Sequence, residues 1–363
     1  MKNEAFDKLM NNAKGRLKTW WGAEKTDRAL FVMHTIKDCP EPNQYFSNLE
    51  DYWYDIPRKL AYEELKMNHT IYYGENYPGT NASLGPGSLA LIIGSEPGLA
   101  WDTVWYHPCF KDLKSASIWL DPSSKYWLWT LDYTKQALQR ANGQYLVELP
   151  DLIENFDTIS SVCGLETLLM STSDCPEEIH RLQDETLSVW LQAFDTLYKL
   201  IRDVDGGMSV GYFNLWAPGR VAKLQCDISA MLSAKMFDTF VAPYLVKQAE
   251  KLDYVLYHLD GPNALQHSDT IIGMDCIDAI QWQPGSAYPD AIDPMWYSLQ
   301  QRILDSGKSI MIFIKPGNPT TLVSRLEAFL KTVGNRGVMF VVEQNLEDEK
   351  IAYDILNNSL KWS

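Results

Sequence analysis

Residues 277–314, IDAIQWQPGSAYPDAIDPMWYSLQQRILDSGKSIMIFI, alternate between two kinds of pattern. Ile277–Trp282 and Ser309–Ile314 are short apolar runs with little alternation, which is typical of strands buried on both faces. Between them, Pro294–Ser306 has the spacing of an amphipathic helix, and Gly307 follows it as a C-terminal cap. The stretch predicts a strand–helix–strand unit with parallel strands.

The same alternation extends along most of the chain. The eight predicted strands are Ala29–Ile36, Tyr145–Leu149, Leu168–Thr172, Ser209–Trp216, Tyr254–Leu259, Ile277–Trp282, Ser309–Ile314 and Val338–Glu343. The clearest predicted helices are Pro176–Asp203, Lys235–Leu252, Pro294–Ser306, Thr320–Val333 and Glu347–Leu360. Strands that alternate with helices in this way favour the α/β class and a (β/α)8 TIM barrel. A doubly wound sheet stays open as an alternative, although no Gly-x-Gly-x-x-Gly follows any predicted strand.

Residues 39–143 interrupt this alternation. The segment is rich in Trp, Tyr, Gly and Pro and contains no clear strand–helix unit. Within it, Asn43–Met67 and Ser123–Ala141 have helical patterns, and Pro78–Trp105 has the pattern of turns and short strands. We therefore expect one domain over residues 1–363, with a long insertion after the first strand that packs over the barrel mouth. A separate N-terminal domain is the alternative, although no linker composition marks a boundary.

The composition indicates a globular, acidic protein. The chain has 363 residues, 46% of them hydrophobic, and its 32 Lys and Arg against 47 Asp and Glu give a formal charge of −15. This charge argues against nucleic acid and anionic membranes as partners, because both are bound through Lys and Arg. The six cysteines are scattered without a CxxC pair, and the first residues carry acids where a signal peptide needs an apolar run. We expect a cytoplasmic protein with reduced thiols, and a homodimer is compatible with these features.

Polar residues gather where the predicted strands end, which is the catalytic face of a barrel. His258 and Asp260 lie two residues apart on one strand, so both side chains point to the same face. Together with Glu343, at the end of the last strand, they form a candidate zinc site with one open position. The structural alternative is that Asp260 caps the turn at Gly261 and that His258 is a hydrogen-bonded core residue.

Several other strand-end residues are candidates for substrate chemistry. Asp227 is a candidate general acid or base, or a group that fixes a polar substrate, and capping of a helix is its structural alternative. Aromatic side chains at strand ends can line an apolar pocket, although most aromatic residues in strands belong to the core. The candidate substrate-binding residues are His34, Trp216, Gln225, Tyr257, Gln281 and Trp282.

Three segments resemble one known family. They are residues 225–233, QCDISAMLS, continuing through Phe237, Phe240 and Pro243 to Tyr257-His-Leu-Asp-Gly-Pro262; Leu149-Pro-Asp-Leu152 with Asp157; and Gln281-Trp-Gln-Pro-Gly285. They are similar to segments of the uroporphyrinogen decarboxylase superfamily, well from about residue 144 to the C-terminus and loosely before it. The resemblance implies a (β/α)8 barrel and one of two activities. One is cofactor-free decarboxylation of the acetate groups of uroporphyrinogen, and the other is zinc-dependent methyl exchange with a corrinoid protein.

The methyltransferase branch fits these residues better. Decarboxylases of the family meet their polycarboxylate substrate through an arginine-bearing N-terminal motif, whereas the first strand here ends at Met33-His-Thr-Ile-Lys-Asp-Cys-Pro40 without arginine. The methyltransferases typically use His-x-Cys and a distant Cys as zinc ligands, and this sequence has His258, Asp260 and Glu343 at those places. Carboxylate ligands keep zinc harder than thiolates do, which suits an oxygen or nitrogen leaving group.

The sequence therefore predicts a corrinoid-dependent methyltransferase that moves a methyl group between a small O- or N-methyl compound and a partner corrinoid protein. Zinc is expected at His258, Asp260 and Glu343. Asp227 and Asp260 are the expected catalytic residues, with Asp227 orienting or protonating the leaving group. The alternative within the family is a decarboxylase of porphyrin biosynthesis. Two further classes stay open, namely a glycosidase with paired carboxylates and a non-catalytic relative that binds a small ligand.

Overall fold

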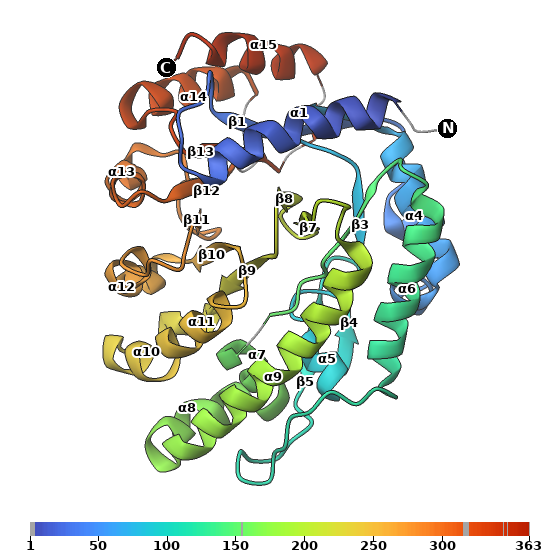
Figure 1. The fold of residues 1–363 in the computed structure, drawn as a ribbon, viewed down its shortest axis with the longest axis vertical. Helices are drawn as coiled ribbons and strands as arrows, with labels where there is room; N and C mark the ends of the chain where they lie inside the picture. The colour runs from blue at the N-terminus through green and yellow to red at the C-terminus, as the bar shows by residue number, and fades with distance from the viewer. Residues whose placement is uncertain (1–3, 154, 315–318, 344, 347, 363) are drawn as a thin grey trace.

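The computed structural model describes residues 4–153, 155–314, 319–343, 345–346 and 348–362. The fold is mixed α/β, and its largest sheet has seven strands in the order β2-β1-β13-β12-β11-β10-β9 (Figure 1). These strands are β1 (Leu30–Ile36), β2 (Thr70–Gly74), β9 (Val221–Gln225), β10 (Tyr254–Asp260), β11 (Ala279–Gln283), β12 (Ser309–Ile314) and β13 (Val338–Val342). Neighbouring strands are parallel throughout, except that β2 runs antiparallel to β1.

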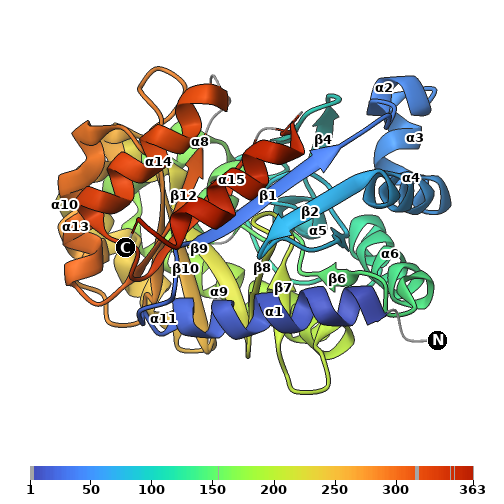
Figure 2. The same ribbon diagram turned by 90° about the horizontal axis from the view of Figure 1, so that it is seen from above.

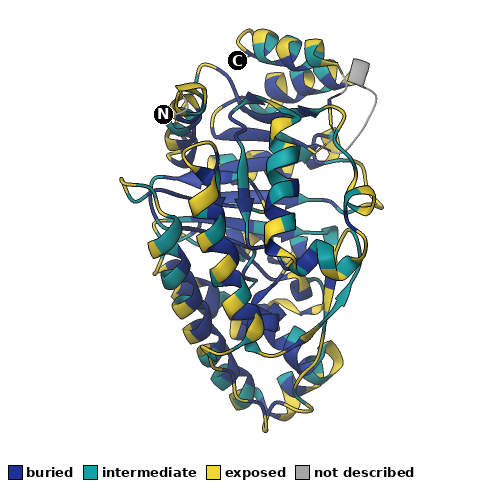
Figure 3. Ribbon diagram, turned by 90° about the vertical axis from the view of Figure 1, so that its right-hand side faces the viewer, coloured by how far each residue is buried: buried dark blue, intermediate teal, exposed yellow. Residues whose placement is uncertain are grey.

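The helices that follow the parallel strands cover the outside of the sheet. They are α10 (Ala234–Phe240) and α11 (Ala242–Ala249) after β9, α12 (Ser268–Ile272) after β10, α13 (Tyr297–Asp305) after β11, α14 (Pro319–Val333) after β12 and α15 (Glu349–Ser359) after β13. The 3-10 turns η1 (Asp227–Met231), η2 (Pro262–His267) and η3 (Pro294–Trp296) lie in the loops after β9, β10 and β11. Strands β1, β11 and β12 are almost fully buried, as their apolar sequences predict, and the helices turn their exposed residues outward (Figure 3).

The remaining strands are short and pair separately. β3 (Gly79–Asn81) is parallel to β6 (Leu146–Glu148), while β4 (Glu96–Leu99) with β5 (Val104–His107) and β7 (Met208–Val210) with β8 (Leu215–Ala217) are antiparallel. Among the described residues, no strand ladder joins these pairs to either edge of the large sheet, so the sheet is not closed. The expected barrel is present only as an arc of parallel strands. The antiparallel β2 occupies the edge of β1 at which the next parallel strand of a barrel would pair.

The expected strand Leu168–Thr172 is wrong, because these residues lie inside helix α8 (Leu165–Asp174). Leu and Met are strong helix formers, and a short apolar run alone does not distinguish a strand from a buried helix. Helix α7 (Asn155–Cys163) precedes α8, and α9 (Pro176–Ile201) follows it. Three consecutive helices therefore separate β6 from β7.

The expected strand Ser209–Trp216 is also wrong as a single element. A turn at residues 211–214 folds it into the β7–β8 hairpin, with Asn214 in the left-handed region at φ 48°. The parallel strand of this region is β9, which the sequence analysis missed because Lys223 and Gln225 give it the polarity of a turn. The strand end that bears on function is therefore that of β9.

Most predicted helices are confirmed with shifted ends. Pro176–Asp203 corresponds to α9, Thr320–Val333 to α14, Pro294–Ser306 to η3 with α13, and Glu347–Leu360 to α15, although residue 347 itself lies outside the described residues. Lys235–Leu252 instead forms two helices, α10 and α11, that meet at Val241. Pro243 explains the break, because it has no N–H to donate to a continuous helix.

Residues 39–143 form a mixed set of elements without a strand–helix unit. They contain α2 (Pro42–Tyr45), α3 (Leu49–Tyr54), α4 (Ile56–Asn68), β2, β3, α5 (Leu89–Ile93), β4, β5 and α6 (Lys125–Ala141). The predicted helix Asn43–Met67 is thus divided into three, and Ser123–Ala141 is found as α6. β2 ties the segment to the main sheet through β1.

Helix α1 (Glu4–Trp21), which was not predicted, runs along one side of the fold beneath β7 and β8 (Figure 2). Trp21 Nε1 donates a hydrogen bond to the carbonyl of Trp216 at 3.0 Å, and the Trp20 ring packs edge-on against that of Trp21 with centroids 4.8 Å apart. Neither this helix nor any other described helix is long and apolar enough to cross a membrane. All six cysteines are free thiols, as expected.

A buried ion pair fixes the turn after β2 and offers a test of the fold. Glu75, only 2% exposed, accepts hydrogen bonds from the Arg28 guanidinium at 2.7 and 3.1 Å and from the Phe31 amide at 2.7 Å. Glu75→Gln leaves Arg28 buried without its counter-charge, so we expect the free energy of unfolding to fall by about 3 kcal/mol. Chemical denaturation measures the loss. The exposed Glu24→Gln is the matched control, and equal effects of the two substitutions would contradict this role of Glu75.

Candidate functional site

Three neighbouring parallel strands bring predicted site residues into one row. In the register of the sheet, His258 on β10 is the partner of Gln225 on β9 and of Gln281 on β11. Residues in register on adjacent strands point to the same face, so these three side chains lie side by side. The row stands near the carboxyl ends of its strands, where α/β folds bind their ligands.

Asp227 and Asp260 extend this row into a candidate metal centre. Asp260 ends β10 two residues after His258, and Asp227 begins η1 two residues after Gln225. Asp227, His258 and Asp260 each offer one ligand atom, and these atoms all lie within 4.8 Å of one another. One nitrogen and two carboxylate oxygens at this separation can close on a single divalent cation through small side-chain rotations.

Gln281 sets the orientation of His258. Its amide oxygen faces Nδ1 of His258, so Nδ1 carries the proton and Nε2 keeps its lone pair for a ligand. Burial lowers the pKa of His258, and the nearby ammonium of Lys223 lowers it further. The imidazole is therefore neutral at neutral pH, which is the form that binds a metal.

Lys223 supplies positive charge behind the cluster. Its ammonium pairs with the Asp151 carboxylate at 2.7 Å, with both side chains almost completely buried, and it also donates to the amide oxygen of Gln225. The amide nitrogen of Gln225 in turn donates to Oδ2 of Asp227 at 2.9 Å. This chain of contacts orients the Asp227 carboxylate, as outer partners do around metal ligands.

Asp157, on α7, holds the turn that carries Asp227. Its carboxylate accepts hydrogen bonds from the backbone amides of Asp227 at 2.8 Å and Ile228 at 3.2 Å. Burial raises the pKa of Asp157, and the charge of Asp227 adds to the rise. Burial also raises the pKa of Asp227, against the lowering effect of Lys223. A cation bound between such carboxylates would stabilise their ionised forms, because it offsets both burial and their mutual repulsion.

Three candidate substrate residues lie away from this row. Tyr257 and Trp282 alternate with the row residues on β10 and β11, so their side chains point to the opposite face, where both are buried. Trp216 lies on β8, and the ammonium of Lys14 from α1 sits 4.7 Å from its ring. The hairpin reverses the chain before β8, which explains why Trp216 does not reach the cluster.

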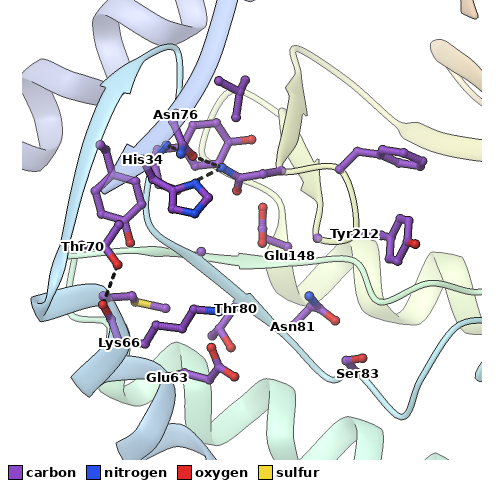
Figure 4. Close-up of a pocket in the computed structure, with 18 of the residues that line it drawn as sticks. His34, Glu63, Lys66, Thr70, Asn76, Thr80, Asn81, Ser83, Glu148 and Tyr212 are labelled. Carbon is purple, nitrogen blue, oxygen red and sulfur yellow. Dashed lines mark hydrogen bonds between the residues drawn. The ribbon is translucent and has the colours of Figure 1, made fainter. Parts of the chain in front are cut away.

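His34 lines a cavity of about 550 Å³ instead (Figure 4). Glu343 also lines this cavity. The titratable residues of its wall are His34, Lys59, Glu63, Lys66, Glu148 and Glu343, together with the tyrosines 52, 72, 77 and 212. Burial lowers the pKa of His34, and the charge of Lys66 adds to the effect. The expected zinc ligand Glu343 therefore faces this cavity and is not a member of the group formed by Asp227, His258 and Asp260.

The β7–β8 turn stands between the cavity and the cluster. Phe213, buried in this turn, lines the cavity, and its ring centroid lies 5.9 Å from that of His258 and 5.3 Å from that of Phe313. Tyr212, 60% exposed, places its ring 5.7 Å from the ammonium of Lys223. The cavity and the cluster therefore adjoin at Phe213.

Sequence reasoning missed four residues of this region. Lys223 is the one charged residue of the strand Val221–Gln225, whose residues are all buried, and a lysine between apolar residues is a signal of buried charge. Lys59, four residues before Glu63, has the pattern of an exposed helical residue. Glu148 is the last residue of the short strand β6, and Asp151 lies three residues later; the strand pairs with the distant β3, which local sequence does not reveal.

Comparison with known proteins supports the fold. The chain superposes on the solved structure of a methyltransferase from Methanosarcina mazei with a TM-score of 0.64, over 97% of this chain and 99% of that chain. The two proteins share a fold. Their sequence identity is 10%, so the likeness is one of fold. No protein-family profile matches the sequence, and no curated protein matches it.

Glu148 is a buried acid at the inner wall of the cavity. It is 3% exposed and accepts a hydrogen bond from the Ser209 hydroxyl at 2.6 Å. A Cβ atom on Gly79 would lie 2.5 Å from Oε2 of Glu148, so a larger residue at position 79 would displace this carboxyl group. Burial raises the pKa of Glu148 to about 7 from its ordinary value of 4.5.

This raised pKa predicts a pH dependence of stability. Between pH 4.5 and about 7 the folded state keeps the Glu148 proton that the unfolded state has lost, so stability falls as the pH rises through this window. Glu148→Gln removes this dependence, and its stability relative to the natural protein should rise by about 3 kcal/mol between pH 4 and pH 8. Urea denaturation at several pH values measures it. The exposed Glu166→Gln should show no such trend, and parallel pH profiles for Glu148→Gln and the natural protein would refute the assignment.

Proposed function

We propose that the chain is a methyltransferase that moves a methyl group from a small O- or N-methyl compound to a corrinoid carried by a partner protein. In this proposal a divalent metal, zinc in the first instance, is held by Asp227, His258 and Asp260. The observation that supports it most is the convergence of these three ligand atoms within 4.8 Å at the strand ends. The fold shared with a methyltransferase is consistent with it. The arc of parallel strands is consistent with the barrel of the uroporphyrinogen decarboxylase superfamily.

The residues of the cluster fit a metal ion by their chemistry. A neutral imidazole and two carboxylates are ligands that zinc accepts, and three protein ligands leave a fourth position for substrate. Both flanking glutamines act on ligands, Gln281 on His258 and Gln225 on Asp227. Asp227 thus takes the place among the proposed ligands that the sequence assigned to Glu343.

The proposed chemistry divides between the metal and the chain. When bound, a metal with this ligand set supplies Lewis acidity toward the oxygen or nitrogen that carries the methyl group. The chain contributes fixed ligand directions, because Asp157 and Gln225 hold Asp227 from two sides. Phe213 adds an apolar wall next to His258.

Metal content tests the proposed ligand set directly. The protein, stripped with chelator and reloaded with zinc, should retain about one ion per chain, and His258→Ala or Asp227→Asn should lower the affinity about tenfold or more. Glu343→Gln and the exposed His107→Ala should retain zinc like the natural protein. Inductively coupled plasma mass spectrometry after dialysis gives the measurement, with circular dichroism to confirm folding. Zinc loss in Glu343→Gln but not in Asp227→Asn would overturn the ligand assignment.

Methyl transfer tests the activity itself. The zinc-loaded protein is incubated with free cob(I)alamin and, separately, methanol, trimethylamine and methoxybenzene, and methylcobalamin formation is followed by absorbance. We expect transfer from at least one donor, with a rate about 100-fold lower in His258→Ala, because an unheld metal cannot act on the leaving heteroatom. His107→Ala should keep the full rate. Transfer that proceeds equally in His258→Ala would exclude the cluster as the reacting site.

A further inference from the structure

Lys59 is a buried cation that forms no ion pair with any described residue, although the charge of Glu63 acts on it and raises its pKa against the effect of burial. The residue is 4% exposed and lies on the wall of the 550 Å³ cavity. Its ammonium donates to the carbonyl of Ser83 at 3.2 Å and lies 4.6 Å from the Trp53 ring and 5.0 Å from the Tyr52 ring. Within the described part of the chain, no carboxylate lies at ion-pair distance from it. The Trp129 ring, 6.0 Å away, is a third aromatic neighbour, so the described residues offer the three N–H donors of this ammonium one hydrogen-bond acceptor, the Ser83 carbonyl.

Helix α4 directs this charge into the cavity. Lys59, Glu63 and Lys66 recur at helical spacing and all three line the cavity, while Leu60 beside them is fully buried in a hydrophobic cluster. Asp55 caps the N-terminus of this helix, because its side chain accepts a hydrogen bond from the backbone amide of Arg58. This face of the helix therefore lines the cavity, with Lys59 buried, Glu63 half-buried and Lys66 exposed.

Burial of an ammonium without an ion pair costs free energy of folding, and an anionic ligand that pairs with it would offset that cost. Burial lowers the pKa of Lys59 to about 8, so it still carries its proton at neutral pH. Lys223 provides the contrast within the same molecule, since its ammonium is paired with Asp151 at 2.7 Å. The unfilled donors of Lys59 face a cavity of the size that holds small organic ligands.

The rest of the cavity wall narrows the chemistry of the ligand. No arginine is among the described residues of the wall, and arginine forks are the usual partners of phosphate. On the same wall, the carboxylates of Glu63 and Glu343 outweigh the ammonium of Lys66, which disfavours a ligand with several negative charges. Tyr72, Phe313 and Val341 offer aromatic and aliphatic surface for an apolar body.

We propose that this cavity binds a small organic monocarboxylate whose carboxylate pairs with Lys59 and whose apolar body faces Tyr72 and Phe313. Because Phe213 adjoins both the cavity and His258, such a ligand lies next to the metal cluster. This proposal rests on the proposed function: the methyl compound that serves as its substrate carries a carboxylate. Figure 4 shows the cavity with Glu63, Lys66, Glu148 and Tyr212 on its wall.

Binding to the metal-free protein tests the site independently of methyl transfer. Isothermal titration calorimetry compares benzoate, the neutral benzamide and inorganic phosphate. We expect benzoate to bind about tenfold or more tightly than either, and Lys59→Met to abolish that preference, because the pairing charge is gone. Lys59→Arg should retain part of it, and the exposed Lys135→Met on α6 should retain all of it. Equal binding of benzoate and benzamide, or an unchanged preference in Lys59→Met, would refute the proposal, and tighter binding of phosphate would refute the carboxylate assignment.

Stability and turnover complete the test. Without ligand, Lys59→Met should melt at or above the temperature of the natural protein, because an unpaired buried charge has been removed. A lower melting temperature would instead indicate a structural role for Lys59. In the cob(I)alamin assay, 4-methoxybenzoate should outperform 4-methoxybenzamide about tenfold or more in kcat/KM. Transfer from the amide alone would refute the substrate class but not the activity, whereas benzoate binding without any transfer would refute the activity but not the site.

Discussion

The parallel register of β9, β10 and β11 is the constraint on which the candidate site depends. It sets Gln225, His258 and Gln281 in one row, and backbone hydrogen bonds on both sides of β10 hold that row in place. A slip of one residue in β10 would replace His258 with Tyr257, whose side chain now points to the opposite face. The apolar residues that alternate with the row are buried, so the hydrophobic core itself enforces the register that aligns the polar groups.

Two buried lysines show how the fold treats charge in different ways. Lys223 belongs to a closed set of contacts, with Asp151 as counter-ion and Gln225 as acceptor, and it acts on the cluster by orienting Asp227 and keeping His258 neutral. Lys59 has ring faces and one carbonyl as its neighbours. The ion pair of Lys223 stabilises the folded structure. The ammonium of Lys59, which has no such pair among the described residues, can instead gain a favourable interaction when an anion binds at the cavity wall.

Local sequence was sufficient for the strands whose apolar runs are bounded by clear turns, such as Ser309–Ile314, and for the His258–Asp260 pair, which needs only the two-residue period of one strand. Local sequence was not sufficient where tertiary contacts determine whether a segment forms a strand or a helix, or which residues lie together. Leu168–Thr172 has the apolar content of a strand but packs as a helix between α7 and α9. The third member of the cluster depends on which strands are neighbours. The sequence pointed to Glu343 by assuming a closed barrel, whereas pairing of β9 with β10 places Asp227 there.

The acidic composition and the proposed anion site are compatible because they act at different distances. The formal charge of −15 is spread over the whole surface, where salt screens charges beyond about 8–10 Å. At Lys59 a carboxylate would meet one ammonium at contact distance in a partly desolvated wall, where a unit pair at 4 Å is worth about 4 kcal/mol at an effective dielectric constant of about 20. The local attraction therefore exceeds the distant repulsion for a single negative charge. For a polyanion, the further carboxylates would meet a wall on which Glu63 and Glu343 outweigh the ammonium of Lys66, so a monoanion is favoured.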